Sequence, residues 1–112
     1  MRGRLRGVNV PLINNDRLLR RVFALGAVGG LKGGGCARLA FTVEDRRGRD
    51  LVVQWMEELG LMVTIDQIGN VVGVRAGLEA GAPVMTGSHI DTVGTSGPYD
   101  GALGVLAGLE VI

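Results

Sequence analysis

Residues 83–104 read PVMTGSHIDTVGTSGPYDGALG and join a short apolar run to a glycine-rich loop. The run at residues 83–88 lies between Gly81 and that loop, which is typical of a buried central strand. His89 follows at the strand end, where open α/β sheets form their ligand crevices. We therefore predict an α/β fold with a mostly parallel sheet and a ligand site at the end of this strand.

Three side chains suited to metal ions, those of His89, Asp91 and Asp100, lie within twelve residues. In an extended backbone, residues two apart point the same way, so Asp91 can accept a hydrogen bond from the His89 ring. That bond fixes the tautomer and makes the other ring nitrogen a better ligand. Turns through Gly94 and Gly97 can fold Asp100 back towards His89. The spacing thus favours a metal site with His89 and Asp100 as ligands and Asp91 as the orienting residue.

Structural roles are the alternative for each residue taken singly. A histidine at a strand end is commonly a hydrogen-bonded structural residue, and an aspartate before a helix is commonly its N-cap. A Ser88-His89-Asp91 triad is disfavoured because neighbouring strand residues point to opposite faces. The glycine-rich stretch 29–35 lacks the ending of a phosphate-binding loop. The combination of all three residues with the loop between them favours the metal site.

The remaining elements follow from periodicity and turn residues. We predict a helix at 14–28 capped by Asn14, a helix that Thr42 caps and Gly60 ends, and a hairpin of residues 61–66 and 70–75. Gly48 is a weak point inside the second helix. A last helix at 101–112 is expected to pack through its small residues, which are Gly101, Ala102, Gly104, Ala107 and Gly108. Since that helix is still building an apolar surface at Ile112, we expect the chain to be the N-terminal part of a larger domain.

Composition excludes several classes of protein. The chain has 112 residues, a net charge of +1 and four aromatic residues, too few for a base-stacking platform. Residues 1–50 are basic and residues 51–112 acidic, which we interpret as two faces that partly neutralise each other rather than a nucleic-acid surface. Met1–Gly7 are a candidate for a short disordered arm. Cys36 is the single cysteine and is expected to pack rather than react. The absence of disulfides, secretory signal and long apolar stretch predicts a cytoplasmic protein with no membrane contact.

The segments GSHIDTV (residues 87–93) and YDGALGVLAGLEVI (residues 99–112) together resemble a family of hydrolases. They are similar to the amidase branch of the zinc-dependent aminoacylase/carboxypeptidase-like enzymes. That branch includes N-carbamoyl-L-amino-acid hydrolase, allantoate amidohydrolase and beta-ureidopropionase. Its most specific feature here is the Tyr-Asp-Gly placed nine residues after Asp91. The resemblance covers nearly all of residues 13–112, leaving 1–12 as an N-terminal arm.

The resemblance implies part of a three-layer, zinc-peptidase-like catalytic domain that cleaves linear C–N bonds of N-carbamoyl amino acids or allantoate. Two divalent ions are implied, with zinc first and manganese, cobalt or nickel as alternatives. His89 matches a ligand of one metal, Asp100 the bridging carboxylate, and Asp91 the aspartate behind the histidine. The metals would activate the water that attacks the carbamoyl or ureido carbon.

The resemblance also implies that the general base, the remaining ligands and a dimerisation domain lie beyond residue 112. We therefore expect a full-length homodimer acting on a small ureido substrate, and an inactive isolated chain. The stretch 94–98 departs from the family pattern, and Pro98 replaces a basic residue there. A peptidase or deacylase of the same superfamily is one alternative function. A non-catalytic interaction module, with its basic half on an acidic partner, is the other.

Overall fold

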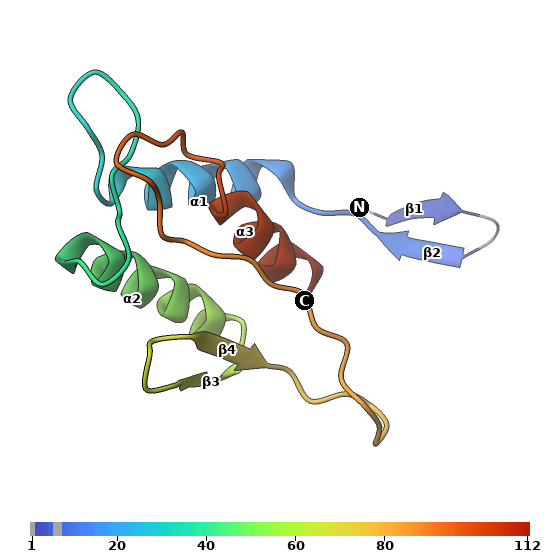
Figure 1. The fold of residues 1–112 in the computed structure, drawn as a ribbon. Coiled ribbons are helices and arrows are strands. Elements are labelled where there is room, and N and C mark those ends of the chain that lie inside the picture. The colour runs from blue at the N-terminus through green and yellow to red at the C-terminus, as the bar shows by residue number, and fades with distance from the viewer. Residues whose placement is uncertain (1, 6–7) are drawn as a thin grey trace.

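A computed structural model describes residues 2–5 and 8–112 of the chain. Figure 1 shows α1 and α3 packed side by side, with α2 lying over a two-stranded hairpin. In the described residues no helix is both long and apolar enough to span a bilayer. The elements in chain order are β1 (Arg2–Leu5), β2 (Val8–Pro11), α1 (Asn15–Ala27), α2 (Val43–Glu58), β3 (Met62–Ile65), β4 (Val71–Val74) and α3 (Ala102–Val111).

The first helix begins and ends as its sequence predicts. The Asn14 side chain accepts a hydrogen bond from the Arg17 backbone N–H at 3.0 Å, which satisfies one of the free amides at the helix start. Gly29 follows the helix with a φ of 81°, a conformation that glycine adopts without strain. The predicted helix at 14–28 is therefore confirmed as α1.

The second helix is closed at its start by a reciprocal pair of hydrogen bonds. Thr42 Oγ1 accepts from the Asp45 amide at 3.2 Å, and the Asp45 carboxylate accepts from the Phe41 amide at 2.9 Å. This arrangement is similar to a capping box, except that the carboxylate accepts from the amide before the N-cap residue, whereas the Thr42 amide donates to the Leu39 carbonyl. Gly60, with a φ of 75°, follows the helix as predicted.

The predicted hairpin is also confirmed. β3 and β4 pair antiparallel, with Met62 opposite Val74 and Ile65 opposite Val71. The Asp66 carboxylate closes the turn, accepting from the amides of Ile68 at 3.0 Å and Asn70 at 2.9 Å. Local turn chemistry therefore determines this register.

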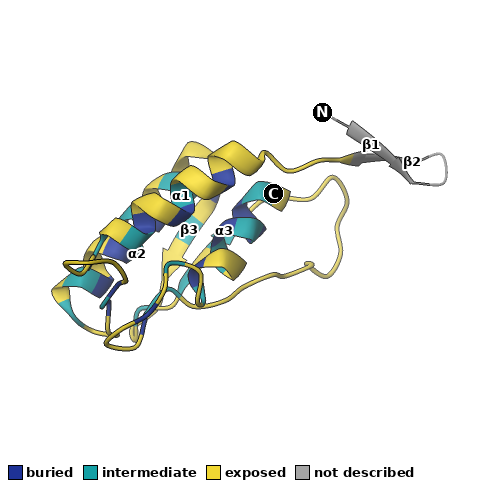
Figure 2. Ribbon diagram, turned by 90° about the horizontal axis from the view of Figure 1, so that it is seen from above, coloured by how far each residue is buried: buried dark blue, intermediate teal, exposed yellow. Residues whose placement is uncertain are grey.

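The core lies where the three helices meet, and Figure 2 shows the buried positions turned towards one another. Helices α1 and α3 supply most of it, because each presents apolar residues at helical spacing. The buried core residues are Leu18, Val22, Leu25, Val52, Leu61, Ala102, Leu106 and Leu109.

The predicted parallel sheet is absent from the described part of the chain, where both strand pairs are antiparallel. Residues 83–88 form no ladder, and Val84 and Met85 are exposed rather than buried. A strand needs neighbours to complete its hydrogen bonds, and no described segment lies along either edge of this run. Its contact is with α3, through Thr86 and Ser88. The prediction of a buried central strand is thus wrong for this structure.

The N-terminal residues also differ from expectation. Arg2–Leu5 and Val8–Pro11 pair antiparallel, with Gly3 opposite Val10. The prediction of a disordered arm at Met1–Gly7 is therefore wrong for Arg2–Leu5, while Met1, Arg6 and Gly7 lie outside the described residues.

Candidate metal centre

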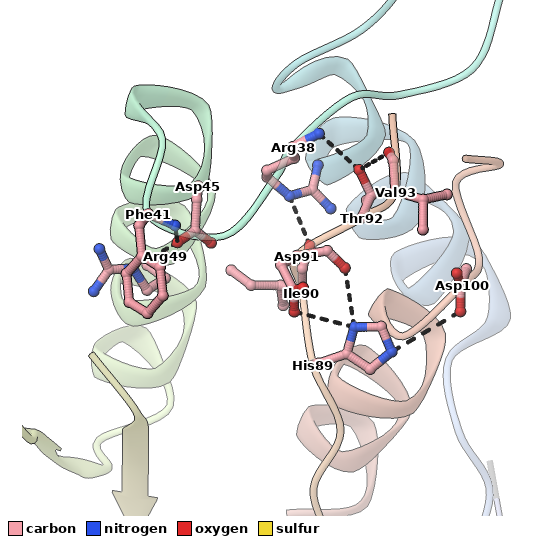
Figure 3. A network of polar contacts seen from close by, with 10 residues as sticks. All are labelled: Arg38, Phe41, Asp45, Arg49, His89, Ile90, Asp91, Thr92, Val93 and Asp100. Carbon is pink, nitrogen blue, oxygen red and sulfur yellow. Dashed lines mark hydrogen bonds and ion pairs between the residues drawn. The ribbon is translucent and has the colours of Figure 1, made fainter. Parts of the chain in front are cut away.

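The imidazole of His89 lies between two carboxylates (Figure 3). Its Nδ1 atom is 2.9 Å from the Asp91 carbonyl oxygen and 3.3 Å from Asp91 Oδ1. Its Nε2 atom is 3.9 Å from Asp100 Oδ1. All three side chains are about half exposed, so the group is open to ions and small molecules from solvent. The structure brings together the three residues that the sequence singled out.

These contacts favour one tautomer of the His89 ring. Nδ1 faces two oxygen acceptors at 2.9 Å and 3.3 Å, whereas Nε2 has only Asp100 Oδ1 at 3.9 Å, so the neutral ring is assigned its proton on Nδ1. Nε2 is then unprotonated, with its lone pair towards Asp100. A histidine that donates through one nitrogen and offers the other is in the state required of a metal ligand.

The two donor atoms are close to the separation of two ligands of one divalent ion. Zinc lies about 2.0–2.1 Å from a histidine nitrogen and about 2.0–2.2 Å from a carboxylate oxygen, so two donors of one tetrahedral ion are about 3.4 Å apart. His89 Nε2 and Asp100 Oδ1 are 3.9 Å apart, so a small movement of the Asp100 side chain would bring both onto one ion. Over residues 2–5 and 8–112, no group of three or more His, Cys, Asp or Glu is arranged around one ion. The chain thus fits a metal with two donors, fewer than the three protein ligands of a catalytic zinc site.

Small residues let α3 approach the site. A β-carbon on Gly101 would lie 2.5 Å from Cε1 of His89, and one on Gly104 would lie 2.7 Å from Cβ of Ser88. One on Gly108 would lie 3.1 Å from Cγ2 of Thr86. The predicted packing of this helix through its glycines is therefore confirmed, against the segment 86–89.

Ser88 and Cys36 have no catalytic arrangement. The Ser88 side chain packs against Gly104 of α3, and no described hydrogen bond joins it to His89. Cys36 is 1% exposed, and its sulfur contacts the Val28 carbonyl oxygen and Arg38. Both observations agree with the sequence interpretation of these residues.

Arg38 was not singled out as a site residue by the sequence. It is 1% exposed, and its guanidinium donates to the carbonyl of Ile90, which lies between His89 and Asp91, at 2.9 Å. The sequence feature that could have indicated a buried neighbour is Gly48 in the middle of α2. A β-carbon on Gly48 would lie 2.7 Å from Arg38 Cδ. Gly48 costs helix propensity, as the sequence predicted. It provides the space that the arginine occupies.

A cavity of about 350 Å³ adjoins the candidate site. His89 and Asp91 lie on one wall, and Arg49 and Asn70 lie on the wall formed by α2 and the hairpin turn. Its size is within the range of sites for small ligands. The cavity therefore offers room for a small polar molecule beside the His89 imidazole.

The chain was compared with known proteins, and no family model matches it. It is 47% identical to N-carbamoyl-L-amino acid amidohydrolase of Geobacillus stearothermophilus over 102 residues, which are 90% of this chain and 25% of the relative. Allantoate deiminase 2 of Glycine max is 35% identical over 103 residues, 91% of this chain and 21% of that protein. The crystal structure of a hydantoinase/carbamoylase family amidase from Burkholderia ambifaria matches with a TM-score of 0.84 and 46% identity. That match covers 88% of this chain and 24% of the amidase.

The chain is homologous to amidases of the hydantoinase/carbamoylase family. It spans about a quarter of the length of these relatives.

Proposed function

We propose that this chain contributes His89, Asp91 and Asp100 to the metal site of an amidohydrolase that cleaves linear C–N bonds other than peptide bonds. The observation that carries the proposal is the geometry of the His89 ring, with Nδ1 against Asp91 and Nε2 facing Asp100 at 3.9 Å. The homology to carbamoylase-family amidases supports it.

Each residue has a distinct task in this proposal. The Asp91 carbonyl oxygen accepts a hydrogen bond from His89 Nδ1 at 2.9 Å, and its carboxylate lies 3.3 Å from the same nitrogen, so Asp91 holds the ring while His89 Nε2 and the Asp100 carboxylate supply metal donors. Asp100 has two oxygens, so its carboxylate can serve two ions. When bound, two divalent ions lower the pKa of a water molecule and stabilise the oxyanion that forms during hydrolysis. The general base and the other ligands are proposed to come from the part of the amidase not represented in this chain.

We also propose the substrate class. The relatives are named for N-carbamoyl-L-amino acids, allantoate and ureidoglycolate, all small polar ureido compounds. The 350 Å³ cavity beside His89 has room for a molecule of that size. The full-length protein is proposed to be cytoplasmic and to form a homodimer, and light scattering of the purified protein tests the dimer.

Metal binding by the chain tests the role of the site directly. Isothermal titration calorimetry with Zn²⁺ is expected to detect one weak site, which Asp100→Asn weakens at least tenfold. Asp50→Asn, on the exposed face of α2, is the matched control and keeps the wild-type affinity. Equal affinities for wild type and Asp100→Asn would remove the metal role.

Activity is tested on the protein in its full natural length. N-carbamoyl-L-amino acids, allantoate and ureidoglycolate are offered beside N-acetyl amino acids and dipeptides, with and without EDTA. We expect EDTA-sensitive release of ammonia from the ureido compounds, and no turnover by the 112-residue chain. Preference for acetylated amino acids or dipeptides would favour the deacylase or peptidase alternative. Strongly salt-dependent binding of an acidic partner, indifferent to metal, would favour an interaction module.

A further inference from the structure

Arg38 carries a positive charge and is buried. None of the ion pairs in the described residues involves it. Its Nη1 donates to the carbonyl oxygens of Leu25 at 2.7 Å and Val28 at 2.8 Å, at the C-terminal end of α1. The last carbonyls of a helix have no partner within the helix and carry the negative end of its dipole. The end of α1 therefore stabilises the charge that burial would otherwise disfavour.

The same side chain reaches the candidate site. Arg38 Nε donates to the carbonyl of Ile90 at 2.9 Å, so one planar group joins the end of α1 to the segment that carries His89. The Arg38 backbone pairs with Thr92, since its amide donates to Thr92 Oγ1 at 2.7 Å and its carbonyl accepts from the Thr92 amide at 2.8 Å. Figure 3 shows Arg38 and Thr92 together at one end of the segment, beyond Asp91, and the imidazole of His89 at the other end.

Arg38 thus contacts residues 90 and 92, and no described hydrogen bond joins it to His89 or Asp91. Side chains alternate between the two sides of an extended segment. Holding Ile90 and Thr92 against the protein therefore presents His89 and Asp91 together on the open side, where Nδ1 meets Asp91 Oδ1 at 3.3 Å. Thr92 is 7% exposed, whereas the side chains of His89 and Asp91 are 54% and 46% exposed.

We propose that Arg38 is the positioning residue of the metal site, acting through Ile90 and Thr92 to hold the His89 ring against Asp91. This inference deepens the proposed function and rests on it for its meaning. Arg38 itself touches neither donor atom of the His89–Asp100 pair. Its effect is on the orientation and tautomer of the His89 ring, and so on the nitrogen offered towards Asp100.

Two variants test the proposal by separate routes. Arg38→Lys keeps the positive charge and much of the volume but loses the planar fork that reaches α1 and Ile90 at once. Thr92→Val keeps the shape of the side chain and removes the oxygen that accepts from the Arg38 amide. Val22→Ala is the control for lost stability. Val22 is fully buried in the core, and its side chain contacts neither Arg38 nor Thr92 through a described hydrogen bond.

His89 is the only histidine of the chain, so its ring nitrogens can be observed without overlap. The ring tautomer is measured by long-range proton–nitrogen correlation NMR of the metal-free chain, at a pH where the ring is neutral. Binding of Zn²⁺ alone is measured by calorimetry. Circular dichroism shows which variants fold. If Arg38→Lys does not fold, the result for Thr92→Val tests the proposal.

We expect the wild type and Val22→Ala to show one tautomer, with the proton on Nδ1. Arg38→Lys and Thr92→Val should populate both tautomers and bind Zn²⁺ about tenfold more weakly, as when a group behind a metal ligand is removed. Folded Arg38→Lys and Thr92→Val that keep the wild-type tautomer and affinity would overturn the proposal. So would an equal change in Val22→Ala. A wild-type chain that binds no Zn²⁺ while the tautomer still responds to Arg38 would retain the positioning role and remove the proposed metal function.

Discussion

Gly101 lies directly against His89, and a β-carbon on the glycine would come within 2.5 Å of the ring atom Cε1 and 2.6 Å of Nδ1. Gly101 also has a backbone φ of 68°, and residues other than glycine adopt this angle only at a cost in free energy. We predict that Gly101→Ala lowers the free energy of unfolding by about 1–3 kcal/mol, from overpacking and backbone strain together. The displaced ring should bind Zn²⁺ more weakly. Denaturant unfolding and calorimetry measure the two effects.

The matched control for Gly101→Ala is Gly97→Ala in the same loop. A β-carbon on Gly97 would meet no atom within 4 Å. This variant should unfold and bind Zn²⁺ as the wild type does. A Gly101→Ala chain equal to Gly97→Ala in both measurements would show that the close approach to His89 is dispensable.

Gly48 is predicted to resist replacement by the best helix former. On propensity alone, Gly48→Ala should stabilise α2 by about 0.8–1.0 kcal/mol. A β-carbon there would lie 2.7 Å from Arg38 Cδ and 3.1 Å from Nε, and overpacking typically costs about 1–3 kcal/mol. We therefore expect a net loss of about 1 kcal/mol in urea unfolding. Arg47→Ala, at an exposed position of the same helix, should change stability by less than about 0.5 kcal/mol. A stabilised Gly48→Ala would mean that Arg38 can shift without cost.

The parts of this structure that could be predicted from sequence are those with local causes. Asn14 and Thr42 cap their helices with their own side chains, and Asp66 closes the hairpin turn through amides two and four residues away. The meeting of His89 with Asp91 belongs to the same class, because the two-residue period of an extended chain is a local property.

The parts that could not be predicted depend on distant partners. Residues 83–88 have the composition of a central strand, but pairing requires neighbouring strands, and none lies beside them in the described residues. The location of Arg38 depends on three segments meeting, at Leu25, at Gly48 and at Ile90. Nothing local distinguishes it from the exposed arginines nearby, and a buried charge is uncommon enough that composition argues against it.

The hairpin turn offers a prediction that does not involve the site. The Asp66 carboxylate accepts from the Asn70 side chain at 2.7 Å as well as from two amides, and the Asn70 side chain is the main reason that the pKa of Asp66 is below its usual value. Asp66→Ala should make the amides of Ile68 and Asn70 exchange faster with solvent, as measured by hydrogen exchange NMR. Asp66→Asn keeps an acceptor oxygen at the same place and should protect both amides nearly as well. Equal protection in the wild type and Asp66→Ala would place the cause of the turn in Gly69 instead.

The last prediction concerns the ion pairs that join α1 to α3. Glu110 Oε1 and Oε2 accept from Arg17 Nε at 2.7 Å and Nη2 at 2.8 Å, and Arg21 Nη1 lies 3.3 Å from Oε1. The Glu110 side chain is fully buried, and the hydrogen bonds from Arg17 hold its pKa below the usual value for glutamate. These pairs also link the basic half of the chain to the acidic half.

A carboxylate with a depressed pKa in the folded state stabilises the protein above its unfolded pKa, which is about 4.3 for glutamate. That stability is lost as the pH falls from about 4.3 through the lower folded pKa, because the unfolded state then binds more protons. Glu110→Gln should therefore lower the free energy of unfolding at neutral pH by about 1–2 kcal/mol, a modest value because the Arg17 side chain is 45% exposed. Urea unfolding between about pH 3 and pH 7 should show the difference from wild type shrinking towards the acidic end. Glu57→Gln, at an exposed position of α2, should track the wild type throughout. A deficit in Glu110→Gln that does not vary with pH would assign the stabilisation to packing rather than to the charge of Glu110.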